Sequence, residues 1–323
     1  MGISIYGTDQ LSYTRVNLKA KIKKKIPPML LTLSHFSQYV DIWTNNVNLS
    51  VKGNYVIIKS GQDKVKLPLN QGGKDFKGKF PNFKRPSHAV RVDYLPIQIR
   101  AVSYAVSSEK EQSPTSGIHL QKTKQNFIVE AADGFHYVRF VNGNTKGKPM
   151  DSVVHQKIGQ LIPRLPSPGY LWHDGSFVFY ECSLGTVAIV TTQYDSYPNL
   201  EKLATREKKC QMTVKRSEIN SLYKKSSIIA ANRVFATRNG KNSLSIRSEN
   251  KDSDGSRELV YEGVVEAEFK GKFPDIVFDV NHIKFLADLY SSDNVVVNFG
   301  GSEDNIWSVD GDMQFLTTPY GSL

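Results

Sequence analysis

Cysteine is scarce in this chain, whose 323 residues hold only Cys182 and Cys210, far apart in the sequence. This scarcity leaves no disulfide framework and favours a reducing cytoplasm in which both thiols are free. Long apolar runs are also missing, and no basic segment followed by an apolar one opens the chain, so the sequence predicts neither a membrane span nor a signal peptide. With 39% hydrophobic and 23% charged residues, the chain is long enough for two or three buried cores.

Motifs for catalysis are missing as well. The seven histidines form no metal-binding helix motif, there is no nucleophile elbow, and the segment 143–149 departs from a phosphate-binding loop in its spacing and its final residue. That segment is better interpreted as a turn. His136 could form an acid-base pair with Asp133, but no third partner is evident. We therefore predict no catalytic residue, no metal and no cofactor, and an enzyme with an unrecognised site stays only as a remote alternative.

Acidic residues are scarce in one part of the chain. The formal net charge is +11, and residues 1–86 contain 15 basic and 4 acidic side chains, while the other 237 residues contain 27 of each. The whole excess therefore belongs to the first quarter of the sequence. Such an excess suggests a polyanionic partner, because neutralising phosphates releases their counterions. The alternative is that Lys21 and Lys23–Lys25 are simply a solvated loop.

What the chain does contain is a module written three times: an amphipathic helix, a strand, a tight turn and a strand, with a proline close behind. The copies run from Leu31 to Pro68, from Val153 to Pro198 and from Val280 to Pro319. Spacing of three and four residues puts the apolar side chains of each helix on one face. These helical stripes are Leu33, Phe36, Val40 and Trp43; Val154, Ile158, Leu161 and Leu165; and Ile283, Leu286 and Tyr290. The repetition predicts a chain of sister domains.

A leading half-module of the same kind precedes two of the copies. Its helices are expected over Leu95–Val106 and Lys215–Ala231, each followed by strands, whereas only strand-like sequence precedes Leu31. Each complete domain would then be two halves of helix and sheet, and the first domain would lack its leading helix. We predict an α+β fold of three repeated domains, helices packed on antiparallel sheets, over residues 1–84, 85–203 and 204–323, with the first incomplete.

Five segments resemble, in order, the bacterial DNA polymerase III β subunit, the sliding clamp. Asp133-Gly134-Phe135-His136-Tyr137 resembles the Asp-Gly-His-Arg-Leu segment of that family's middle domain. The other four are Asn46 to Leu69, Tyr197-Pro198-Asn199-Leu200, Phe278 to Ile283 and the tail from Leu316 to Leu323. Each motif is weak alone, but together they cover essentially the whole chain in the order that the family requires.

The resemblance implies a non-catalytic processivity factor for DNA replication. Two chains would form a head-to-tail homodimeric ring with helices lining the hole, and duplex DNA would slide through it without being read. The expected location is the cytoplasm, in association with the nucleoid. Basic residues on the helices would meet phosphates; the candidates are Arg100, Lys157, Arg164, Lys215, Arg216, Lys224, Lys225 and Lys284. The alternative for each is an ordinary solvated charge.

The family also implies a peptide-binding pocket between the second and third domains. Short linear motifs of the polymerase catalytic subunit and the clamp loader would insert hydrophobic anchors there. The matching positions are Thr115, Ala132, Gly134, His136, Tyr137, Pro198, Lys202, Leu203, Val234, Asp279, His282, Thr317, Pro319 and Tyr320. Three departures suggest a different partner preference: His136 replaces an arginine, Ala132 replaces a threonine, and the C-terminal tail differs.

Ring closure in the family joins the first domain of one subunit to the third domain of the other. The matching positions are Val65 and Leu67 on an edge strand, and Ile228 and Ile229 at the end of a helix. Two neighbouring isoleucines cannot share one helical stripe, so one is expected to be exposed, the alternative being that both are core. The short first domain leaves a second hypothesis open, a clamp-derived peptide-binding adaptor or decoy that does not close a ring. Family clamps begin with a helix and a strand ahead of the segment that resembles Ile5-Tyr6-Gly7-Thr8-Asp9, so an upstream start codon is worth seeking.

Overall fold

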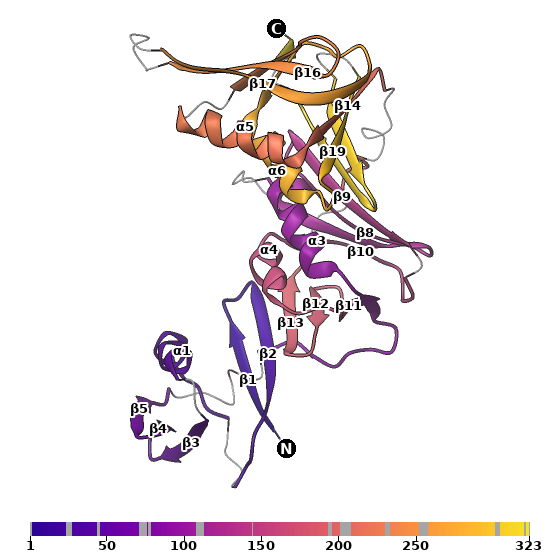
Figure 1. Cartoon of the computed structure of the whole chain (residues 1–323). Coiled ribbons are helices and arrows are strands. Elements are labelled where there is room, and N and C mark those ends of the chain that lie inside the picture. The colour runs from indigo at the N-terminus through magenta and orange to yellow at the C-terminus, as the bar shows by residue number, and fades with distance from the viewer. Residues whose placement is uncertain are drawn as a thin grey trace. The chain divides into compact units, whose positions relative to one another are not determined.

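The computed structural model describes residues 2–23, 28–43, 46–70, 76, 79–107, 113–143, 145–192, 196–200, 208–229, 233–251, 258–300, 304–319 and 321–322. The chain divides into two compact units (Figure 1). The first comprises Met1–Lys84 and Leu184–Ala188, and the second comprises Arg85–Ser183 and Ile189–Leu323. No helix among the described residues is both long and apolar enough to cross a membrane.

The first unit holds a hairpin and a small helix-covered sheet. Turn chemistry sets the sheet's register, because Gly53 and Gly61 adopt φ of +58° and +60°, which glycine tolerates best. Phe36 of the helix and Trp43 pack on buried Val56 and Ile58 of the central strand. Its elements are β1 (Gly2–Thr8), β2 (Ser12–Lys19), α1 (Leu33–Ile42), β3 (Val47–Lys52), β4 (Tyr55–Ser60) and β5 (Asp63–Pro68), with antiparallel order β3-β4-β5.

The first half of the second unit packs helix α3 (Leu95–Val102) on the sheet strands β8 and β9. Leu95, Ile99 and Val102 are completely buried, and Pro96 lies in the first turn, where its missing N–H costs nothing. The other elements are β6 (Val90–Val92), β7 (Gly117–Lys122), β8 (Asn126–Ala132), β9 (His136–Gly143), β10 (Met150–His155), α4 (Ile158–Leu161), β11 (Gly169–His173) and β12 (Phe177–Glu181), with 3-10 turns η1 (Ser103–Ala105), η2 (Pro114–Ser116) and η3 (Ile162–Arg164). Strand β13 (Gly185–Val190) begins in the part of the chain that belongs to the first unit and ends in the second.

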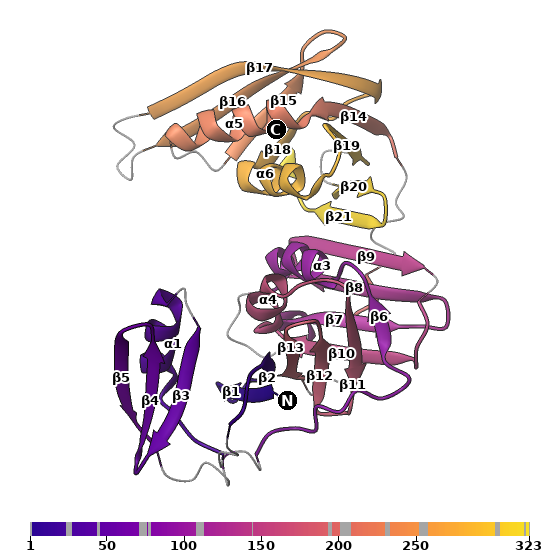
Figure 2. The same ribbon diagram turned by 60° about the horizontal axis from the view of Figure 1, so that its bottom comes forward.

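The second half repeats this plan with helices α5 and α6, which pack against each other (Figures 1 and 2). Helix α6 starts at a clear cap, because the Asp279 carboxylate accepts the Asn281 N–H at 2.7 Å. The elements are β14 (Cys210–Lys215), α5 (Arg216–Ile228), β15 (Arg233–Arg238), β16 (Ser243–Lys251), β17 (Glu258–Gly271), β18 (Ile276–Asp279), α6 (Val280–Leu289), β19 (Asn294–Phe299), β20 (Ile306–Asp310), β21 (Met313–Thr317) and β22 (Gly321–Ser322).

One sheet runs through both halves of the second unit. Its 13 strands follow the order β10-β7-β8-β9-β21-β20-β19-β14-β17-β16-β15-β18-β22. The halves join where β9 pairs with β21, from Met313 opposite Phe140 to Thr317 opposite His136, and Figure 2 shows these two strands side by side. The predicted α+β class, with helices packed on antiparallel sheets, is confirmed.

One predicted helix is wrong at its start. Val153 and Val154 belong to strand β10 and are both buried, so Val154 is not on a helical stripe with Ile158. The helix is reduced to the single turn of α4, which continues into η3 around Pro163. Apolar residues four positions apart, such as Val154 and Ile158, occur in one turn of a helix. They also occur where a buried strand ends shortly before a helix, and the spacing alone does not distinguish these arrangements.

Candidate functional site

A turn at the junction of β9 and β21 brings together several of the predicted site residues. Asp133 accepts backbone N–H groups from Phe135 and His136 at 2.9 and 2.7 Å, and Gly134 takes φ of +92°. The second carboxylate oxygen of Asp133 lies 2.8 Å from Nδ1 of His136. The Thr318 N–H donates to the Phe135 carbonyl at 2.9 Å, so the turn is tied to the end of β21.

Four rings from three elements meet beside this turn. His136 of β9 lies edge-on to His282 of α6, with centroids 3.9 Å apart, and the Thr317 hydroxyl is 3.1 Å from Nδ1 of His282. Tyr104 of η1 is 5.0 Å from the His136 ring and stacks on Phe285 of α6 at 3.6 Å. The two halves of the second unit therefore form a shared aromatic and imidazole cluster, the His136–His282 cluster, comprising Tyr104, His136, His282, Phe285 and Thr317.

The pKa values of the groups in and beside this cluster are shifted in different directions. Burial and the neighbouring His136 lower the pKa of His282 to about 4. Burial together with the charges of Asp279 and Asp133 raises the pKa of Tyr104 to about 12. Burial of Asp133 opposes its ionisation, but the hydrogen bonds from His136 and Phe135 outweigh burial and lower the pKa of the carboxyl.

One nitrogen of this cluster lacks a partner. Nε2 of His136 is buried and has no hydrogen-bond partner among the described residues. The ring itself is only 8% exposed, and its other nitrogen is held by Asp133. A buried nitrogen without a partner costs free energy, so this atom can accept or donate one hydrogen bond to a bound group.

An apolar cluster lies on the adjoining strands. Ala132, Tyr137, Trp307 and Leu316 are buried together, and Leu200 packs against them from the segment that leaves the first half. The Tyr137 hydroxyl donates to Glu130 at 2.5 Å, which fixes the ring from its polar end. Apolar side chains from β8, β9, β20, β21 and the segment 196–200 thus meet at the junction.

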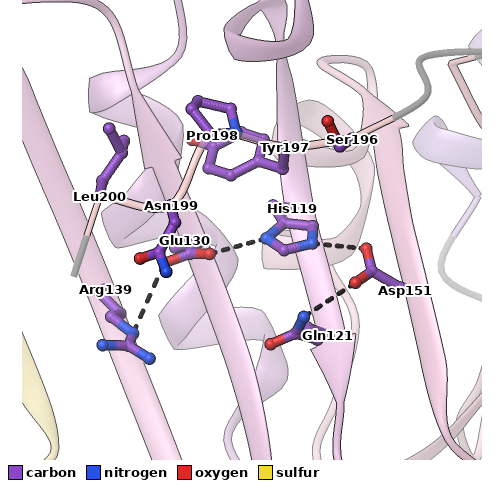
Figure 3. Close-up of a pocket in the computed structure, with 10 residues that line it drawn as sticks. All are labelled: His119, Gln121, Glu130, Arg139, Asp151, Ser196, Tyr197, Pro198, Asn199 and Leu200. Carbon is purple, nitrogen blue, oxygen red and sulfur yellow. Dashed lines mark hydrogen bonds and ion pairs between the residues drawn. The ribbon is translucent and has the colours of Figure 1, made fainter.

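A polar cavity of about 220 Å³ lies under the segment 196–200 (Figure 3). The His119 ring is held between two carboxylates, with Nδ1 2.7 Å from Glu130 and Nε2 2.8 Å from Asp151. Tyr197 stacks on the same ring at 4.5 Å. Burial acts to lower the pKa of His119, but its hydrogen bonds to both carboxylates prevail and the pKa is raised. The residues that line this cavity are His119, Gln121, Glu130, Arg139, Asp151, Ser196, Tyr197, Pro198, Asn199 and Leu200.

The structure brings some, but not all, of the predicted pocket residues together. Ala132, Gly134, His136, Tyr137, His282 and Thr317 meet at the junction, Asp279 caps α6 beside them, and Pro198 lines the polar cavity. Thr115 lies in η2, and its carbonyl accepts the Ser107 N–H just after η1. Val234 is completely buried in β15 opposite Phe278, and Pro319 is half-buried. Lys202, Leu203 and Tyr320 lie outside the described residues.

The predicted DNA-contacting residues lie on or beside helices. Arg100 of α3 and Arg164 of η3 are exposed neighbours, because Arg100 donates to the Pro163 carbonyl at 3.2 Å. Lys284 pairs with Asp288 and lies near the Tyr223 ring. Arg216 donates to the Tyr290 carbonyl at 2.9 Å and approaches Asp293, so it also ties two elements together. Lys157 precedes α4, Lys215 precedes α5, and Lys224 and Lys225 are exposed on α5.

The predicted interface residues differ in exposure. Ile228 at the end of α5 is 83% exposed, while Ile229 is half-buried. On β5, Leu67 is buried and Val65 is half-buried against the core of the first unit. An isoleucine exposed to this extent at a helix end is an available apolar contact.

Several central residues had not been identified from the sequence. Tyr104 and Phe285 were not singled out, although Phe285 lies three residues after His282 on α6 and therefore on a neighbouring part of the helix. His119, Glu130 and Asp151 come from three different strands, so their meeting depends on the registers of β7 with β8 and of β7 with β10. Among the described residues, no group of three histidine, cysteine or acidic side chains is arranged to hold a metal ion.

Comparison with known proteins places this geometry in a known fold. No family model matches the sequence, and no curated protein matches it either. Among solved structures, the chain is similar to a putative DNA polymerase III β subunit of Eubacterium rectale, with 13% identity over 98% of this chain and 88% of that one and a TM-score of 0.83.

Two further structures agree. The β subunit of Thermotoga maritima has 16% identity over 100% and 89% of the two chains with a TM-score of 0.82. The Pseudomonas aeruginosa sliding clamp, solved bound to griselimycin, has 14% identity over 98% and 88% with a TM-score of 0.78. Nearly the whole chain therefore has the fold of the DNA polymerase III β subunit, the sliding clamp.

Proposed function

We propose that this protein is a DNA sliding clamp, a non-catalytic processivity factor that encircles duplex DNA and tethers a replicative polymerase. The observation that carries the proposal is the likeness over 98–100% of the chain to sliding clamps, with TM-scores of 0.78–0.83. A match of that extent includes every repeat rather than one common domain. We also propose that the repeats form three domains, 1–84, 85–203 and 204–323. A dimer would then form a ring of six domains.

In this proposal the helices meet the DNA. Exposed Arg100 and Arg164 lie together in the first half of the second unit, and exposed Lys224 and Lys225 lie on α5 in the second half. Long basic side chains on helix surfaces contact phosphates without reading bases, which suits a protein that slides. Lys284 is close to Tyr223 on α5 and would join the same surface.

The partner peptide would bind at the β9–β21 junction. The His136–His282 cluster offers stacked aromatic surface and one buried nitrogen without a partner, and the apolar cluster around Tyr137 lies next to it. A linear motif from a polymerase or clamp loader needs such a combination: apolar contacts for affinity and a few polar groups for orientation.

Mass in solution and DNA topology test the clamp. Sedimentation should give twice the 36.3 kDa of the chain, because a ring needs two subunits. The dimer, once loaded, should stay on a closed circular plasmid during gel filtration and be released when a restriction enzyme cuts the circle. A monomer whose retention does not depend on DNA topology would contradict the proposal and favour a peptide-binding adaptor that forms no ring.

A separate experiment tests the peptide site. His136→Asn removes the imidazole that faces His282, and the expected result is at least tenfold weaker binding of a polymerase C-terminal peptide, measured by fluorescence anisotropy. His173→Asn is a matched control, because His173 lies on β11 and belongs to neither cluster. The dimer should persist in both variants, and equal peptide affinity in both would refute this site.

A further inference from the structure

The outer face of the small sheet β3-β4-β5 carries a concentration of positive charge. Strand alternation directs Val56 and Ile58 of β4 into the core, where Phe36 and Trp43 pack. Tyr55, Ile57 and Lys59 alternate with Val56 and Ile58 along β4 and therefore face away from the core. Their partners in the register on β3 and β5 face the same way. That outer face consists of Asn48, Ser50, Lys52, Tyr55, Ile57, Lys59, Lys64, Lys66 and Pro68, here called the lysine face.

Four lysines of this face are exposed, and none of its positions is acidic. These lysines are Lys52, Lys59, Lys64 and Lys66. Lys59 lies directly opposite Lys64 in the antiparallel register, an arrangement that is unfavourable because like charges on facing positions repel. This repulsion raises the free energy of the folded sheet when no ligand is bound. An anionic ligand would relieve it, so such a cluster is expected at an anion-binding site.

An aromatic ring lies among these charges. Tyr55 is 39% exposed, and the Lys66 ammonium lies 3.7 Å from the centre of its ring. A phosphate next to Lys66 would draw the ammonium aside and expose the ring face. Cations that follow a backbone, together with an aromatic platform for a base, are the two parts from which single-strand binding surfaces are built.

The charge of the whole chain points the same way. Residues 1–86 carry the entire net charge of +11, although the helices proposed to contact duplex DNA in the second unit belong to a segment with 27 basic and 27 acidic residues. The basic excess is therefore not explained by those helices. Part of this basic excess lies on a sheet face of the first unit, whereas the proposed contacts with duplex DNA lie on or beside helices of the second unit.

We propose that the lysine face is a second nucleic-acid site, which binds single-stranded nucleic acid through its phosphates at Lys52, Lys59, Lys64 and Lys66 and by stacking of a base on Tyr55. Single strands are favoured over a duplex because only an unpaired base can reach the tyrosine ring from a surface with no element to enter a groove. The inference does not depend on ring closure.

Fluorescence anisotropy with a labelled oligothymidine of about 20 nucleotides, longer than one expected site, tests the proposal on the full chain. Replacing all four lysines by glutamine should weaken binding roughly 10- to 100-fold at low salt and reduce the slope of log affinity against log salt by up to about 3, since each phosphate contact on a single strand contributes about 0.7. Tyr55→Ala should weaken binding about tenfold, while Tyr55→Phe should be nearly neutral.

The matched control replaces Lys124, Lys146, Lys148 and Lys241 by glutamine, because these exposed lysines of the second unit give the same change in net charge. It should bind like wild type. Equal weakening in both quadruple variants would overturn the site in favour of general electrostatic attraction.

Competitors distinguish other anions. The single-strand assignment would be overturned if a duplex of the same length bound as tightly and Tyr55→Ala left the affinity unchanged. If polyglutamate bound equally well, the site would instead be assigned to an acidic protein partner. Thermal unfolding of each variant checks the fold. A normal dimer that fails to bind the oligonucleotide would refute this site and leave the proposed clamp function intact.

Discussion

Two histidines of the second unit occupy opposite electrostatic environments. His119 lies between the carboxylates of Glu130 and Asp151, which favour its charged form and raise its pKa despite burial. His282 is half-buried against another imidazole, that of His136, and its pKa falls to about 4. The two residues should therefore respond to pH with opposite signs.

The first prediction concerns His119. Its folded pKa lies above 6.5, so its charge contributes stability that is complete below about pH 6.5 and is lost as pH rises through the folded pKa. His119→Gln should lower the free energy of unfolding by about 1–3 kcal/mol at pH 6 and by less at pH 9. Urea unfolding at the two pH values measures this, with His173→Gln as a partly exposed control. A loss that is the same at both pH values would argue against a charged His119.

The second prediction concerns His282. Its folded pKa of about 4 lies below the ordinary 6.5, so its contribution is present above about pH 6.5 and is lost as pH falls toward 4. Wild type should thus lose about 1–2 kcal/mol more than His282→Gln between pH 7 and 4, a figure reduced for the partial exposure of the ring. Denaturant titrations of both proteins test the difference, and parallel acid profiles would contradict it.

At the scale of the element, the sequence predicted best where one period ran without interruption. The helices α1, α3, α5 and α6 were expected close to their observed positions, as were most hairpins of the repeats, because a stripe of period 3.6 or an alternation around a glycine turn is a local property. The helix expected from Val154 was wrong because the buried end of β10 mimics the first position of the stripe.

Other strands were missed although their patterns were present. Strand β14 alternates buried Cys210, Met212 and Val214 with more exposed residues, and β15 does the same with Val234 and Ala236. Both strands have only six residues and flank helix α5, whose 13 residues give the stronger local periodicity. The contacts of His119 with Glu130 and Asp151 could not be predicted at all, since they require the pairing of three strands, which no local period specifies.

The third prediction addresses the junction of β9 and β21. Leu316 is 3% exposed and packs with Tyr137 and Trp307 where the two halves of the second unit share one sheet. Leu316→Ala should lower the free energy of unfolding by about 2–4 kcal/mol, because it removes buried methyl groups and leaves a cavity. Leu200→Ala, at a partly buried position of the same cluster, should cost less. Chemical denaturation measures both, and equal small losses would show that the junction is not tightly packed.

At the scale of the whole molecule, net charge is unevenly distributed along the chain. The net positive charge belongs to residues 1–86, whereas the most exposed large apolar side chain among the described residues, Ile228, lies in the charge-balanced remainder. A head-to-tail dimer of the proposed kind would use such an asymmetry, because each contact joins two different surfaces of the chain rather than two copies of one surface.

The last prediction follows from that arrangement. Ile228 is 83% exposed at the end of α5 and makes little contribution to the core of its own chain. Ile228→Glu should therefore leave the unfolding temperature almost unchanged but weaken the dimer by about 100-fold, since the contact would have to bury a charge without a partner. Val309→Glu introduces the same charge at an exposed position of β20 outside the proposed interface and should not affect dimerisation. Sedimentation velocity over a dilution series measures both variants. If the Ile228→Glu protein dimerises like wild type, ring closure does not use the end of α5, whereas equal weakening by Val309→Glu would mean that added charge, and not the position of Ile228, opposes association.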